Sequence, residues 1–99
     1  MTTRNPDMAP MHPGELLRED IIPAVKQPIT RIAAGLGVSR QHLHAILSER
    51  KPVSPDMALR LAAMFGGSAD LWMRLQGAYD VWHARRAVDV SAIPRMTAA

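Results

Sequence analysis

The chain has 99 residues, of which 47% are hydrophobic and 21% charged, a composition typical of one soluble globular domain. It contains no cysteine, which excludes disulfides, thiolate metal sites and cysteine nucleophiles, and no apolar run approaches the roughly 20 residues of a membrane-spanning helix. The net charge is +3, but residues 26–51 hold five Lys or Arg and one Glu, a local +4, which is the pattern of an anion-binding face.

The first part of the chain is predicted to be a flexible arm followed by a helix. Residues 1–11 have no periodicity and no hydrophobic signal sequence, so we expect a mobile arm on a cytoplasmic protein. Pro13 suits the first turn of a helix, and Glu15 complements the dipole there. An apolar stripe should face the core: Leu16, Leu17 and Ile21. We expect Pro23 to end this helix, with residues 24–27 as a linker.

The central segment has the pattern of two short helices joined by a tight turn. Apolar residues at helical spacing predict a helix over 29–36: Ile29, Ile32, Ala33 and Leu36. Gly37 permits a left-handed exit from this helix, and Ser39 is a good N-cap for the next, residues 40–48. The second helix should bury Leu43, Ile46 and Leu47. This arrangement is the sequence form of a helix-turn-helix, and a plain helical hairpin is the alternative.

Two more helices follow. Ser54, Pro55 and Asp56 together indicate a helix start, and this helix ends at Gly66. Ser68 should cap a fifth helix that reaches about Arg85. Five short helices with short loops predict a compact all-α domain over 12–86. Residues 87–99 are weakly patterned and are expected to be a tail or a short strand.

The helix over 39–48 is the predicted recognition helix. In a helix-turn-helix protein this helix lies in the major groove of double-stranded DNA, with its first residues on the base edges. We expect its outer face to contact bases through Arg40, Gln41, His42 and His44. Residues near the helix ends are expected to contact the DNA backbone: Thr30, Ser39, Ser48, Arg50 and Lys51.

The fifth helix, about 68–85, is predicted to pair two copies of the chain. It carries a bulky stripe at helical spacing: Trp72, Leu75, Tyr79 and Trp82. Ordinary core packing explains part of such a stripe, but aromatic residues are also enriched at interfaces. A homodimer would supply two recognition helices about 34 Å apart, as a palindromic operator requires.

These residues resemble a known family. The opening His12-Pro13-Gly14-Glu15 is similar to the first helix of HigA-type antitoxins, within the broader Xre/Cro-like repressor superfamily. Leu71-Trp72-Met73-Arg74-Leu75-Gln76, followed by Tyr79-Asp80, resembles the fifth-helix signature of that family. The resemblance covers about residues 12–86, and it implies a five-helix lambda-repressor-like fold.

The resemblance implies a role in a type II toxin–antitoxin system. Such antitoxins neutralise a HigB-type toxin, an mRNA-cleaving ribonuclease of RelE-like fold, and repress their own operon by binding its palindromic operator as dimers. The arm 1–11 and the tail 87–99 follow no family pattern, so the toxin-contacting surface stays open. A stand-alone or prophage-type repressor without a toxin is the alternative function.

An enzyme is the third functional class, and the sequence contains no motif for one. His42 and His44 are two residues apart, so on a helix their rings diverge by about 200°. The chain has no His-Glu-x-x-His, no phosphate-binding glycine loop and no serine elbow. We therefore expect no catalytic residue, no metal and no cofactor.

Overall fold

The regular secondary structure of residues 8–98 is entirely helical. The computed structural model describes residues 8–98, and within that range it contains five helical segments, the first built of three contiguous parts. In chain order they are α1 (Pro13–Leu16), η1 (Leu17–Ile21), α2 (Ile22–Val25), α3 (Ile29–Leu36), α4 (Arg40–Leu47), α5 (Pro55–Phe65) and α6 (Ala69–Ala87). The predicted all-α fold class is confirmed. Among the helices of this range, none is long and apolar enough to cross a membrane.

The first helix continues through Pro23, so the prediction that it ends there is wrong. Leu17–Ile21 is a π-helical turn, in which the Ile22 N–H donates to the carbonyl of Leu17, five residues back. In an α-helix the ring of Pro23 would clash with the carbonyl four residues back, and its nitrogen has no hydrogen to donate to that carbonyl. The wider π turn relieves the clash and does not require that hydrogen bond. The helix ends instead at Lys26, whose φ of 56° is left-handed.

The core lies where α1, η1, α3, α4, α5 and the start of α6 meet. Its buried apolar residues are Leu17, Ile32, Ala33, Leu36, Leu43, Ile46, Leu47, Val53, Met57, Ala58, Leu61 and Trp72. Each fully buried leucine or isoleucine contributes about 1.5–3 kcal/mol relative to an exposed one. Because α4 supplies three of these residues from one face, its opposite face is left to the solvent.

His12 caps the first helix from inside the protein. Its side chain is only 2% exposed, and its Nδ1 accepts a hydrogen bond of 2.8 Å from the N–H of Gly14. The ring also lies edge-on to Tyr79 of α6, with the ring centroids 4.8 Å apart. An Nδ1 that accepts is unprotonated, so this cap requires the neutral imidazole. Burial lowers the pKa of His12 below its ordinary 6.5, opposed by the carboxylates of Glu49 and Asp80.

The lowered pKa of His12 predicts a loss of stability in mild acid. Below about pH 6.5 the unfolded chain binds a proton at His12 more readily than the folded chain does. The free energy of unfolding therefore falls as the pH falls. His12→Asn keeps an N-cap oxygen but does not titrate. We expect urea midpoints measured between about pH 7 and pH 5 to decline less for the variant. Equal declines in the two proteins would refute this role of His12.

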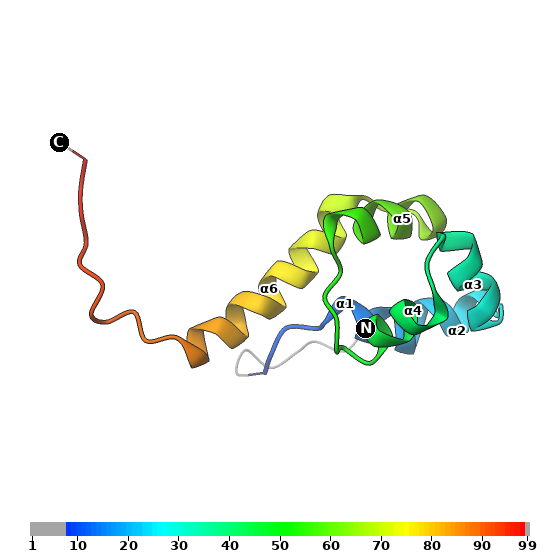
Figure 1. The fold of residues 1–99 in the computed structure, drawn as a ribbon, viewed down its shortest axis with the longest axis horizontal. Coiled ribbons are helices and arrows are strands. Elements are labelled where there is room, and N and C mark those ends of the chain that lie inside the picture. The colour runs from blue at the N-terminus through cyan, green and yellow to red at the C-terminus, as the bar shows by residue number, and fades with distance from the viewer. Residues whose placement is uncertain (1–7, 99) are drawn as a thin grey trace.

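The two ends of the chain leave the body differently. Ala9, Pro10 and Met11 are half-buried, so the described end of the predicted arm lies against the domain, while residues 1–7, and residue 99 of the tail, lie outside the described residues. Helix α6 reaches Ala87, two residues further than predicted, and extends away from the compact body (Figure 1). Residues 88–98 follow it without a strand.

Candidate nucleic-acid interface

The turn between α3 and α4 is closed by backbone hydrogen bonds. Gly37 has a φ of 76°, and its N–H donates to the carbonyl of Ala34 at 3.1 Å. The N–H of Val38 donates to the carbonyl of Ala33, also at 3.1 Å. This pair of bonds is the Schellman motif, which suits glycine because the left-handed conformation costs it nothing. The turn directs α4 across α3 and confirms the predicted helix-turn-helix.

Ser39 starts α4 as predicted. Its Oγ accepts a hydrogen bond of 3.0 Å from the N–H of His42. A hydroxyl keeps its own hydrogen when it accepts, so Ser39 is still able to donate to an anion such as a phosphate. The exposed N–H groups of the first turn of α4 add a partial positive charge at the same place.

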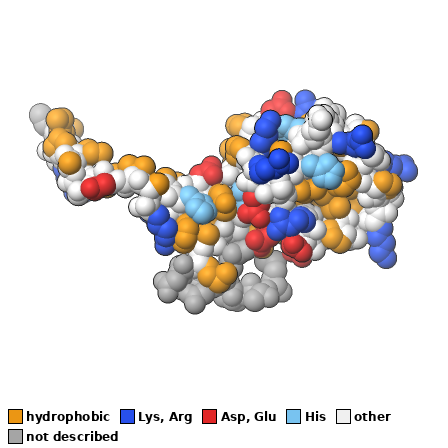
Figure 2. Space-filling model, turned by 60° about the horizontal axis from the view of Figure 1, so that its bottom comes forward, with side chains coloured by type: hydrophobic (Ala, Val, Ile, Leu, Met, Phe, Trp, Pro, Cys, Tyr) orange, Lys and Arg blue, Asp and Glu red, His pale blue; other side chains and the backbone are white. Residues whose placement is uncertain are grey.

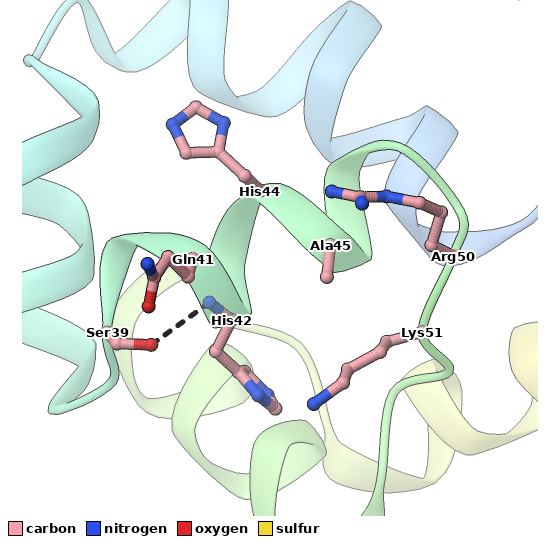
Figure 3. A pocket seen from close by; sticks show the side chains of 7 residues that line it. All are labelled: Ser39, Gln41, His42, His44, Ala45, Arg50 and Lys51. Atoms are coloured by element: carbon pink, nitrogen blue, oxygen red, sulfur yellow. Dashed lines mark hydrogen bonds between the residues drawn. The ribbon is translucent and has the colours of Figure 1, made fainter.

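The exposed face of α4 borders a shallow hollow that it shares with the turn after the helix. The hollow has a volume of about 510 Å³ and is lined by Ser39, Gln41, His42, His44, Ala45, Arg50 and Lys51 (Figure 3). A neighbouring hollow is lined by Ser39, Arg40, Gln41 and His44. The structure therefore brings together seven of the nine predicted DNA contacts around these two hollows. The other two are Thr30 and Ser48.

His42 is set apart from the other predicted base-contacting residues. It is half-buried, whereas Arg40, Gln41 and His44 are exposed. Its ring lies toward Lys51 in Figure 3, and it also lines a groove with Asp56 at the start of α5. The outward row on α4 thus consists of Arg40, Gln41 and His44, with His42 at its edge.

The side chain of Ser48 is hydrogen-bonded to Arg50 and to the end of α4. Its hydroxyl donates to the carbonyl of Ala45 at 3.2 Å and accepts from Nε of Arg50 at 2.9 Å. These two bonds orient the guanidinium beside α4. Thr30 is exposed in the first turn of α3 and lines neither hollow.

The positive charge of this surface is little offset by acids. Within residues 26–51 the one acid, Glu49, is paired with Arg18 of η1 at 3.3 Å. Figure 2 shows Lys and Arg side chains spread over the body, and many of the acidic side chains on that face gathered in one place. An anion approaching the exposed face of α4 therefore meets more cationic than anionic groups, with Asp56 at the edge beside His42.

Two arginines that the sequence pattern did not single out support the helix-turn-helix. Arg18 donates from Nη1 to the carbonyl of Leu47, the last residue of α4, at 2.6 Å. Arg60 donates to the carbonyl of Leu36, the last residue of α3, at 2.9 Å and pairs with Asp56 through Nε. Both cations satisfy carbonyls that a helix end leaves open. Only the Asp56–Arg60 spacing of four residues was visible in the sequence.

The aromatic stripe of α6 is divided between the core and the surface. Trp72 is only 3% exposed, so its prediction as a dimer-interface residue is wrong: its ring fills the core of its own chain. Leu75, Tyr79 and Trp82 are half-buried. Trp82 carries the guanidinium of Arg86 over its ring, 3.3 Å from the ring centroid. Beyond Gln76, no residue of α6 is buried.

Residues 8–98 hold no group of three or more His, Asp or Glu arranged to bind a metal ion.

The chain is similar to several proteins of known structure or description. No family model matches it. It is 34% identical to the antitoxin GraA, solved in complex with its operator, over 98% of this chain and 100% of that one, with a TM-score of 0.82. It is 37% identical to the Pseudomonas aeruginosa antitoxin HigA, solved with the higBA promoter, over 79% and 85% of the two chains, with a TM-score of 0.75. Virulence-associated protein I of Dichelobacter nodosus is 37% identical over 76% of this chain and 69% of its own length.

Proposed function

Because the chain belongs to the HigA family of helix-turn-helix antitoxins, we propose that it is the antitoxin of a type II toxin–antitoxin pair. It binds the palindromic operator of its own operon as a homodimer, and it neutralises a HigB-type toxin, an mRNA-cleaving ribonuclease. The observation that carries the DNA-binding role is the outward row on α4, beside a turn with two exposed cations. The proposal places both activities in the cytoplasm and involves no catalytic step.

The side chains of α4 have distinct roles in this proposal. Arg40 pairs with a guanine edge and Gln41 with an adenine edge, as their donor and acceptor groups allow. His44 and His42 complete the base-contacting set. The DNA backbone is held by Thr30, Ser39, Ser48, Arg50 and Lys51, with Ser48 acting through Arg50.

The second half of α6 is the proposed dimer seam. Within the DNA-binding domain, residues 12–86, it is a projecting element that buries none of its residues after Gln76. Leu75, just before Gln76, is half-buried, as are Tyr79 and Trp82 after it, and Val81 is 48% exposed. Apolar surface of this kind is stabilised when a second copy covers it. Light scattering of the purified protein should therefore give the mass of two chains.

Two experiments test the proposed function. The protein should enrich one palindromic sequence from a random pool of duplex DNA; enrichment of none would contradict the repressor role. The protein should also co-purify with the product of the adjacent gene when both are expressed. If that product is no small basic protein, or does not bind, a stand-alone repressor is the better description.

Lys51→Ala is expected to weaken binding to every duplex by a similar factor. Lys51 is exposed, and a lysine near a phosphate contributes a charge but reads no base. The slope of log affinity against log salt should become shallower by about 0.9, the value for one phosphate contact. Fluorescence anisotropy at several salt concentrations measures it. A variant that loses affinity for the enriched duplex alone would instead place Lys51 on a base.

A further inference from the structure

Gln76 of α6 is a buried polar side chain in an apolar core. It is only 3% exposed, and both ends of its amide are used. Its Oε1 accepts a hydrogen bond of 2.8 Å from the N–H of Val53. Its Nε2 donates to Oδ1 of Asp80, one turn further along α6, at 2.9 Å. The second bond holds the amide in the orientation that the first one needs, because a flipped amide would present a donor to a donor.

Val53 ends the turn that carries the two cations. We call residues 48–53 the anchor turn. Its first half is tied to α4, since the N–H groups of Arg50 and Lys51 both donate to the carbonyl of Ala45, at 2.9 and 3.1 Å. Its second half is fixed at Val53, which is only 1% exposed and whose N–H donates to Gln76. Only Pro52 separates Val53 from Lys51, and the proline ring fixes φ, so the position of Val53 is passed on to Lys51.

We propose that Gln76, held by Asp80, is a positioning residue for DNA binding, which rests on the proposed function. It fastens the end of the anchor turn to α6 and thereby holds Arg50 and Lys51 where phosphates of the DNA backbone lie. Gln76 itself is too buried to touch DNA. Loss of this link loosens the end of the turn while the base-contacting row on α4 keeps its own cap and its own core residues. The pair therefore sets the sequence-independent part of the affinity and leaves base discrimination alone.

The test compares salt dependence with base discrimination in Gln76→Leu. Anisotropy titrations would use the duplex that the wild-type protein enriches and an unrelated duplex of the same length. We expect affinity for both duplexes to fall about three- to tenfold and the salt slope to become shallower by about 1 to 2. The ratio of the two affinities should stay within about twofold of the wild-type ratio. A folded variant with the wild-type slope, or with a lowered ratio, would overturn the proposal.

Two further variants separate positioning from mere destabilisation. Ser68→Ala removes the N-cap of α6, whose Oγ accepts from Leu71 at 3.1 Å, and destabilises the domain far along the chain from the anchor turn. It should keep the wild-type salt slope. Gln76→Glu combined with Asp80→Asn allows both hydrogen bonds to form again, and it should restore the slope that Gln76→Leu loses. If Ser68→Ala reproduces the Gln76→Leu slope, or the double variant does not recover, Gln76 is structural only.

Asp80→Ala serves if Gln76→Leu does not fold. Asp80 is exposed, so its replacement opens no cavity in the core, while it removes the acceptor for Nε2 of Gln76. The salt slope should shift in the same direction, and a wild-type slope would overturn the proposal. The slope is measurable on any duplex, because phosphate binding is independent of sequence. Failure of the wild-type protein to enrich a sequence would count against the proposed function and not against Gln76.

Discussion

Replacing Gly14 by alanine is expected to lower the free energy of unfolding by about 3 kcal/mol or more. A Cβ added at Gly14 would overlap the carbonyl oxygen of Ile46 and lie 2.9 Å from its carbonyl carbon. Both atoms belong to the backbone of α4, which cannot move aside by changing rotamer as a side chain can. The contact between α1 and α4 would have to open, and α4 would shift with it. Affinity for DNA should therefore fall together with stability.

Gly77→Ala is the matched control for Gly14→Ala. Gly77 lies inside α6, and a Cβ added there meets no atom within 4 Å other than its chain neighbours and the backbone of its own helix. Alanine is the better helix former by about 1 kcal/mol, so this variant should be as stable as the wild type or more stable. Urea denaturation followed by circular dichroism measures both variants. Equal stability of Gly14→Ala and the wild type would show that α1 and α4 are not packed as closely as described.

Arg40→Ala is expected to cost about 1–3 kcal/mol of binding energy on the enriched duplex. Arg40 is exposed in the first turn of α4, at the end that enters the major groove in helix-turn-helix proteins. A guanidinium that pairs bidentately with guanine discriminates against the other bases, so its loss should also relax the preference at one base position. Titrations against a set of duplexes with single base changes would show both effects.

Arg95→Ala removes the same charge from the tail and is the control for Arg40→Ala. Arg95 is exposed and lies well beyond the end of α6. Its replacement should leave the base preference unchanged. If Arg40→Ala behaves like Arg95→Ala on every duplex, the face of α4 assigned to the bases is misplaced.

Local signals predicted most of the helices correctly. Helix α3 has the predicted bounds, and Ser39, Ser54 and Ser68 each accept a hydrogen bond from an N–H three residues on. These features are determined within one or two turns of chain, so a single sequence carries them. Gly37 also adopts the left-handed conformation that its place after α3 required.

Predictions fared less well where a helix departs from α geometry or where a distant partner decides the outcome. Pro23 does not end the first helix, because a π turn before it removes the clash. Trp72 was assigned to a dimer seam on the spacing of α6, but spacing alone does not say which face another helix covers. Gln76 was visible only as part of a family signature, and its role depends on Val53, 23 residues away.

Local sequence signals were enough to predict the later helices, their serine caps, the turn at Gly37 and the cationic segment around α4. How the helices cross determines which side chains are buried or hydrogen-bonded and which face the solvent. Arg18 reaches the end of α4 across 29 residues of chain, and Gly14 lets the backbones of α1 and α4 meet. The physical reason is that helix formation depends on near neighbours and periodicity, whereas burial and hydrogen bonding between helices depend on how the helices cross.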